Sequence, residues 1–244
     1  MIDLGLMPDA QAQAWGTLVE LHQIVPDHWT IVGGQMVYAH CMDRGFTGAR
    51  PTMDADTVLD VRARAKILYE FSRALKDLGF TPERNNVAGH QSHWRRDGVR
   101  VDVMIPAGLG QRASMRPGVM GATALQTPGA QKALNRTETV EVTGEGFSGG
   151  TVPLPSMLGA LVAKSRAFQV DRQPGRDRHL EDLLALAQLT RPKDVLREAD
   201  LAERRTLATG LRDAASFARS RSDDAALDAL EAVATMARLD VALR

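Results

Sequence analysis

VGGQMVYAHCMDRGFTGARPTMDADTV, residues 32–58, joins a pair of glycines to an Asp-x-Asp sequence. The glycines follow a short apolar strand and precede a helix predicted over residues 35–46. Asp54 and Asp56 lie two apart on the next predicted strand, so their side chains point to the same face. Two carboxylates this close repel each other unless a cation lies between them. The stretch therefore predicts a charged site on one face of a sheet.

A third carboxylate belongs to a later strand, VRVDVMI at residues 99–105. Its apolar side chains alternate onto one face and leave Asp102 on the opposite one. Carboxylate oxygens are the ligands that Mg²⁺ prefers, and bound Mg²⁺ keeps waters that a phosphate can replace. Asp54, Asp56 and Asp102 on neighbouring strands would suit one or two Mg²⁺ (or Mn²⁺) ions in phosphoryl or nucleotidyl transfer.

Gly33 and Gly34 complete this pattern. A glycine turn before a helix presents backbone N–H groups and the positive end of the helix, which suits the phosphates of a nucleoside triphosphate (NTP). The alternative is an ordinary tight turn between strand and helix. That alternative accounts for the glycines but leaves the downstream acids unexplained.

The composition is that of a globular protein and excludes disordered and membrane-spanning classes. Of 244 residues, 44% are hydrophobic and 25% are charged, and no apolar stretch is long enough to cross a bilayer. Cys41 is the single cysteine, which excludes an internal disulfide framework. With no recognisable signal segment, a cytoplasmic location is expected, without a membrane partner.

Charge is unevenly distributed along the chain. Residues 1–61 hold eight acidic and two basic side chains, whereas residues 62–136 hold five acidic and thirteen basic ones. An acidic region beside a basic one suits a metal site next to a polyanion. Solvated charged faces are the simpler explanation, and the sequence leaves both open.

The chain divides into a predicted α/β catalytic domain at residues 1–153 and a helical domain at residues 154–244 that completes the active-site cleft. A hairpin with an Asp-Gly turn is predicted at residues 90–105, and residues 107–137 read as a long loop. GEGFSG, residues 144–149, matches a dinucleotide-binding letter pattern, but prolines follow where a helix is required, so we interpret it as a hairpin turn.

The stretch quoted above, with the later RVDVM, resembles the minimal nucleotidyltransferase superfamily. The spacing Arg50-x-Thr52-x-Asp54-x-Asp56 is similar to the AbiEii/AbiGii (MenT-like) toxin branch. The nineteen residues between Gly34 and Asp54 exceed the spacing in the smallest members. The resemblance implies an α+β nucleotidyltransferase fold, a small mixed sheet flanked by helices, followed by an all-helical C-terminal half.

The same resemblance implies roles for Lys164 and Asp182 in two successive helices. Both residues lie on the apolar, inward stripes of their helices, where a charge is costly unless it is paired or faces a ligand. Lys164 could hold the triphosphate; the alternative is a Lys164–Asp182 ion pair between the helices. Arg178-His179 departs from the family's usual basic-Asp pair and leaves the role of Asp182 open.

The resemblance implies an enzyme that transfers a nucleoside monophosphate from an NTP to the 3′ end of tRNA, with Arg50 among the nucleotide-binding residues. It also implies a toxin with a cognate antitoxin protein. Alternatives are nucleotidylation of a small molecule or a protein, and a non-catalytic nucleotide-binding member. An acidic acceptor pocket would favour a cationic small molecule.

Some nearby residues have weaker predictions. His90 and His93 are three apart on a predicted strand, face opposite ways and make a poor zinc pair. Arg95, Arg96 and Arg100 flank Asp102, either as a solvated edge or as contacts for nucleic-acid phosphates.

Overall fold

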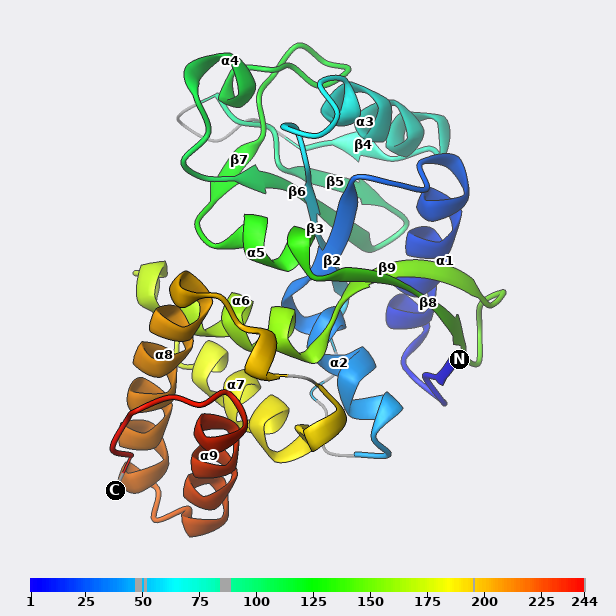
Figure 1. The fold of residues 1–244 in the computed structure, drawn as a ribbon. Coiled ribbons are helices and arrows are strands. Elements are labelled where there is room, and N and C mark those ends of the chain that lie inside the picture. Colours follow the sequence, from blue (N-terminus) through cyan, green and yellow to red (C-terminus); the bar gives the residue numbers. More distant parts are fainter. Residues whose placement is uncertain (47–49, 51, 84–88, 195, 244) are drawn as a thin grey trace.

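A computed structural model describes residues 1–46, 50, 52–83, 89–194 and 196–243 (Figure 1). The strands are β1 (Ile2–Asp3), β2 (Trp29–Val32), β3 (Asp54–Leu59), β4 (Thr81–Pro82), β5 (His93–Arg96), β6 (Val99–Pro106), β7 (Leu125–Thr127), β8 (Thr137–Thr143) and β9 (Gly150–Pro155). The α-helices are α1 (Asp9–Ile24), α2 (Gly33–Asp43), α3 (Ile67–Asp77), α4 (Gln111–Ser114), α5 (Ala130–Asn135), α6 (Met157–Val170), α7 (Arg178–Leu189), α8 (Leu201–Ser220) and α9 (Asp224–Met236). Two 3₁₀ turns, η1 (Pro192–Asp194) and η2 (Leu196–Glu198), precede α8.

The main sheet is mixed, with strand order β2-β3-β6-β5-β4, and β7 pairs with the far end of β6. Strands β3 and β6 are parallel, whereas β2 and β5 run antiparallel to their neighbours. A smaller sheet has the order β1-β8-β9, and its strand β9 lies against β2. The predicted α/β class, with small mixed sheets flanked by helices, is confirmed.

Alternation along β6 separates a core face from a polar face of the main sheet. Val99, Val101, Val103 and Ile105 are buried with the apolar core, and Asp102 points the other way. Helix α1 contacts β3 and β6, and α3 packs beside α1. Helix α5 contacts β2, β3 and β6 and also packs on α6, so it joins the sheet to the helical half (Figure 1).

The helical half consists of α6 to α9, with α6 packed against both α7 and α8. Its buried leucines, such as Leu183 and Leu211, belong to the same hydrophobic cluster as Trp15 and Val101 of the α/β half. The two halves therefore share one core. Among the described residues, no helix combines the length and apolarity needed to cross a bilayer.

One sequence prediction was wrong: residues 107–137 are not a long loop. They contain α4, β7 and α5. Each is too short to carry a hydrophobic period, and β7 exists because β6 offers it a pairing edge. The hairpin interpretation of residues 144–149 is confirmed, since they connect the antiparallel strands β8 and β9.

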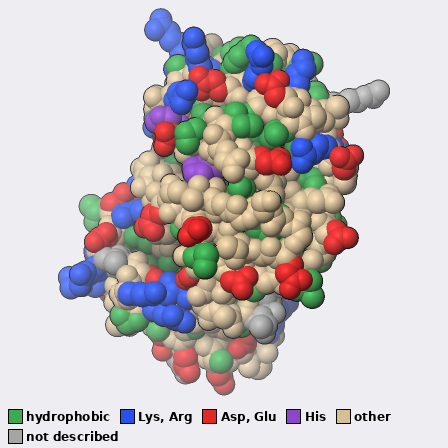
Figure 2. All heavy atoms as spheres, turned by 90° about the vertical axis from the view of Figure 1, so that its right-hand side faces the viewer, with side chains coloured by type: hydrophobic (Ala, Val, Ile, Leu, Met, Phe, Trp, Pro, Cys, Tyr) green, Lys and Arg blue, Asp and Glu red, His purple; other side chains and the backbone are tan. Residues whose placement is uncertain are grey.

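Acidic residues gather on one face of the molecule. Residues 1–43 and 137–155 contain no Lys or Arg, and contacts of β1 with β8 and of α1 with β9 bring these stretches together. Figure 2 shows acidic side chains across the middle of this side, with most basic ones toward its top and lower left. We call the surface formed by residues 1–43 and 137–155 the acidic face; its exposed carboxylates are those of Asp3, Asp9, Glu20, Asp27, Asp43, Glu138, Glu141 and Glu145.

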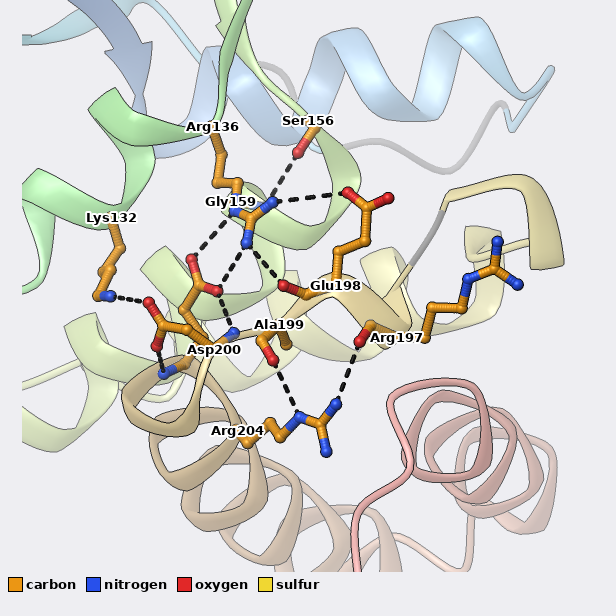
Figure 3. A network of polar contacts seen from close by, with 10 residues as sticks. Lys132, Arg136, Ser156, Gly159, Arg197, Glu198, Ala199, Asp200 and Arg204 are labelled. Atoms are coloured by element: carbon orange, nitrogen blue, oxygen red, sulfur yellow. Dashed lines mark hydrogen bonds and ion pairs between the residues drawn. The ribbon is translucent and has the colours of Figure 1, made fainter.

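A network of hydrogen bonds and ion pairs connects the start of β8 to the start of α8 (Figure 3). Arg136 donates to both carboxylate oxygens of Glu203, at 3.1 and 2.9 Å, and Glu203 is almost fully buried. Glu203 also closes a capping box with Asp200 at the N-terminus of α8, and Lys132 pairs with Asp200. This network ties the α/β half to the helical half.

Candidate active site

A cavity of about 770 Å³ lies between the polar face of the main sheet and the helices α6 and α7. Every residue that the sequence singles out for the site lines it: Gly33, Gly34, Arg50, Asp54, Asp56, Asp102, Lys164 and Asp182. They come from five separate segments of the chain. The fold thus brings the predicted residues together, although their individual roles stay predictions.

The strand register aligns the carboxylates. In the parallel pair β3–β6, Asp56 lies directly beside Asp102, and Asp54 lies beside Arg100. Directly paired residues point to the same face of a sheet, so the three carboxylates and Arg100 share the wall of the cavity.

The glycine turn lies against this wall. Gly33 is the first residue of α2 and has φ +69°, a conformation that glycine adopts at no steric cost. A Cβ atom at Gly33 would lie 1.8 Å from Oδ2 of Asp56, and one at Gly34 would lie 2.9 Å from the Cβ of Thr52. Only glycine at position 33 lets the N-terminus of α2 approach the strand carboxylate so closely.

Asp102 is held by two residues whose part in the site the sequence did not predict. Arg100 donates to both of its oxygens, at 2.6 and 2.7 Å, and Nδ1 of His93 lies 2.7 Å from Oδ1. The position of His93 beside Asp102 could have been predicted from the Asp-Gly turn in the sequence. The turn at Asp97-Gly98, with φ +48° and +87°, sets a two-residue hairpin whose register pairs His93 with Asp102.

Asp56 is an energetically costly carboxylate. Burial, followed by the negative charges of Asp102 and Asp54, raises its pKa to about 6, while Lys164 and Arg100 oppose the rise. Its carboxylate is therefore close enough to both neighbouring acids to be repelled by them.

The carboxylates fit a hard divalent cation in donor type and in register. Oxygen donors on adjacent strands, with uncompensated repulsion at Asp56, are what Mg²⁺ would stabilise. Within the described part of the chain, no three His, Cys, Asp or Glu side chains converge as a ready-made metal cluster. The oxygens of Asp102 accept from Arg100 and His93 in this structure, so Asp102 must turn from Arg100 to bind a metal.

Lys164 and Asp182 form the ion pair that the sequence left open as the alternative to triphosphate binding, with Nζ 2.6 Å from Oδ2. Both side chains are buried, as the sequence predicted, and both line the cavity wall. The two interpretations are thus compatible: Asp182 holds a lysine that faces the site. Burial and the charge of Lys164 lower the pKa of the neighbouring His179, which keeps this imidazole neutral at pH 7.

Other candidates lie outside this chemistry. Burial raises the pKa of Cys41 to about 11, so its thiol is protonated at pH 7. Arg95 pairs with Glu83, and Arg96 stacks on Phe80 and donates to a backbone carbonyl. These two arginines make contacts within the chain, and contact with nucleic acid remains a prediction.

Comparison with solved structures identifies the fold. A nucleotidyltransferase-like protein from Paracoccidioides brasiliensis superposes with a TM-score of 0.54 and 19% identity, over 93% of this chain and 94% of that one. The antibiotic-resistance factor ANT(2'')-Ia gives a TM-score of 0.47 and 12% identity, over 88% of this chain and 99% of that one. No protein-family model and no curated protein matches the sequence. The chain has a nucleotidyltransferase-like fold.

Proposed function

We propose that this protein transfers a nucleoside monophosphate from an NTP to an acceptor hydroxyl. One observation carries the proposal: Asp56 and Asp102 are register partners on parallel strands, with Gly33 packed on Asp56, in a single cavity. Carboxylates on adjacent strands can hold the metal ions used in nucleotidyl transfer, and a glycine turn before a helix can hold phosphates.

The chain's own residues divide the work of binding and orientation. Gly33 and Gly34, at the start of α2, line the cavity, where their N–H groups would hold phosphate oxygens. Lys164, kept in place by Asp182, would neutralise negative charge on the triphosphate as a point charge. Arg50, which also lines the cavity, would contact the nucleotide.

The carboxylates of Asp54, Asp56 and Asp102 would hold Mg²⁺. When bound, the metal ion would supply charge stabilisation for the reacting phosphoryl group. Asp102 would complete this ligand set or accept the proton of the acceptor hydroxyl. The acceptor oxygen bonds to the α-phosphorus as the bond to pyrophosphate breaks, and catalysis rests on positioning and electrostatics.

The acceptor that we propose is the 3′ end of tRNA, and the protein would act as a toxin neutralised by a cognate antitoxin. The support is the Arg50-x-Thr52-x-Asp54-x-Asp56 spacing together with the excess of basic residues in 62–136. A small hydroxylated molecule is the second acceptor class.

Labelled NTPs test the acceptor. The protein is incubated with each α-labelled NTP, Mg²⁺ and either total tRNA or a panel of aminoglycosides. Label is expected on tRNA and not on tRNA whose 3′ end has been oxidised by periodate. Label on an aminoglycoside alone would replace RNA by a small-molecule acceptor. Label on oxidised and intact tRNA alike would exclude the 3′ end as the acceptor.

A further inference from the structure

A second cavity, of about 630 Å³, lies along strand β8 and away from the proposed active site. One wall is the strand itself, residues 137–141. The opposite wall comes from the end of α2 and from η1, including Arg44 and Lys193. Strand β1 covers only the far end of β8, where Ile2 and Asp3 pair with Val142 and Thr143. The rest of this edge of β8 has no strand beside it among the described residues.

The pairing of β8 with β9 determines which backbone N–H and C=O groups of β8 point to the uncovered edge. Register pairs Thr139 with Pro153, and the carbonyl of Pro153 accepts from Thr30, away from β8. Thr139 therefore belongs to a pair that exchanges no backbone hydrogen bonds, and its N–H and C=O point to the uncovered edge. Thr143, four residues on, confirms this direction because its carbonyl accepts from Leu4 on the β1 side.

Arg44 lines this cavity and is paired with carboxylates of the chain. Its side chain is 6% exposed and forms ion pairs with Asp43 and Asp194. Its Nη1 atom is nevertheless buried without a hydrogen-bond partner among the described residues. Because this atom has almost no accessible surface, it is a cost within the fold and not a contact for a ligand in the cavity.

We propose that this groove binds an extended, basic polypeptide segment of a partner protein, which adds as a strand to the open edge of β8. Backbone hydrogen bonds to Thr139 would supply affinity, as in other cases of strand addition.

Charge identifies the partner. Of the cations that line the cavity, Arg44 and Arg136 already pair with carboxylates of the chain, and Lys193 is exposed at its rim. Glu138 and Glu141, on opposite faces of β8, have no ion pair among the described residues and would lie beside side chains on both faces of an added strand. Lys and Arg side chains on the incoming strand would be attracted to the acidic face (Figure 2).

The same charges argue against two other occupants. Nucleic acid would be repelled by the acidic face. A second copy, pairing β8 with β8, would bring the Glu138 and Glu141 carboxylates of both chains together. Neither occupant would gain from the charge pattern that favours a basic strand.

Peptide selection tests the proposal independently of any transferase activity. The full chain is screened against displayed random linear peptides, and enriched peptides are measured by fluorescence anisotropy against three variants. Thr139→Pro removes the outward N–H and leaves the β8–β9 hydrogen bonds intact. Glu138→Lys reverses a charge on β8 beside the open edge. Glu145→Lys, the control, makes the same reversal on the hairpin turn. Circular dichroism checks that each variant folds. If Thr139→Pro does not fold, the test is the comparison of peptide affinity between Glu138→Lys and Glu145→Lys.

Enriched peptides are expected to be rich in Lys, Arg and β-branched residues. Their affinity should fall about tenfold or more in Thr139→Pro and in Glu138→Lys, but little in Glu145→Lys. Basic peptides that bind all variants equally, or a selection that enriches no basic peptide, would overturn the proposal. Self-association of the wild-type chain that Thr139→Pro abolishes would assign the edge to a second copy instead.

Discussion

Gly33 and Asp56 are in such close contact that no larger residue fits at position 33: a Cβ there would lie 1.8 Å from the Asp56 carboxylate. The contact joins the N-terminus of α2 to strand β3 and so links the two parts of the proposed site, the phosphate-binding turn and the metal-binding strand.

Gly33→Ala should abolish nucleotidyl transfer, because the methyl group must displace Asp56 or move the start of α2. We expect activity to fall by more than about 100-fold. Gly45→Ala is a matched control, since Gly45 has φ +71° and an added Cβ would meet nothing within 4 Å. It carries the same backbone strain of about 1 kcal/mol without the clash. Equal activity loss in both variants would mean that backbone strain, and not the Asp56 contact, is responsible.

Asp56→Asn should stabilise the metal-free protein while it abolishes activity. The Asp56 pKa is raised from 3.8 to about 6, so the folded protein retains a proton that the unfolded chain has lost between these pH values. The stability of the wild type therefore falls as pH rises through this window, and above it the ionised carboxylate is a net cost. At pH 8 the variant should gain up to about 2 kcal/mol in free energy of unfolding.

Urea unfolding at several pH values measures this gain. The difference between variant and wild type should shrink as pH falls toward 4. Added Mg²⁺ should raise the melting temperature of the wild type and not that of Asp56→Asn. A variant less stable than the wild type at pH 8 would show that Asp56 is already well compensated in the fold.

Lys164 and Asp182 can be separated by a double-mutant cycle. Lys164→Met and Asp182→Leu should each destabilise the fold by about 3 kcal/mol, because each leaves a buried charge unpaired. The double variant should recover much of the stability, since an apolar pair can replace a buried ion pair. NTP binding, followed by calorimetry, should stay weak in the double variant. Recovered NTP binding would reduce the pair to a structural role.

Stability also rests on the network between β8 and α8. Arg136→Ala should lower the free energy of unfolding by about 2 kcal/mol, because it leaves Glu203, only 1% exposed, without its cation. Arg204→Ala is the control from the same network, since Arg204 donates to the backbone carbonyls of Ala199 and Arg197 and compensates no buried charge (Figure 3). Its cost should stay below about 1 kcal/mol in thermal unfolding. Equal losses of unfolding free energy in the two variants would show that compensation of the buried Glu203 charge is not what Arg136 contributes.

Much of the site could be predicted because the direction of its side chains follows from strand alternation and helical spacing. The alternation of two in β3 and β6 sets the faces of Asp56 and Asp102, and helical spacing sets the inward direction of Lys164. His93 was predictable in principle from the Asp-Gly hairpin register and was missed.

Two other features lay beyond local pattern. Element β7 is only three residues long and forms because the end of β6 is free to pair, which depends on tertiary arrangement. The contact of Arg100 with both oxygens of Asp102 also depends on packing, because a sequence alternation gives the shared face of two side chains but not their partners.

The central claim is transfer of a nucleoside monophosphate at Asp56. It is tested most directly by parallel reactions with α-labelled and γ-labelled NTP, Mg²⁺ and total tRNA, using the wild type and Asp56→Asn. The account predicts α-label on RNA, γ-label in released pyrophosphate, and neither product from the variant. Covalent γ-label on RNA, or α-label transferred equally well by Asp56→Asn, would contradict it.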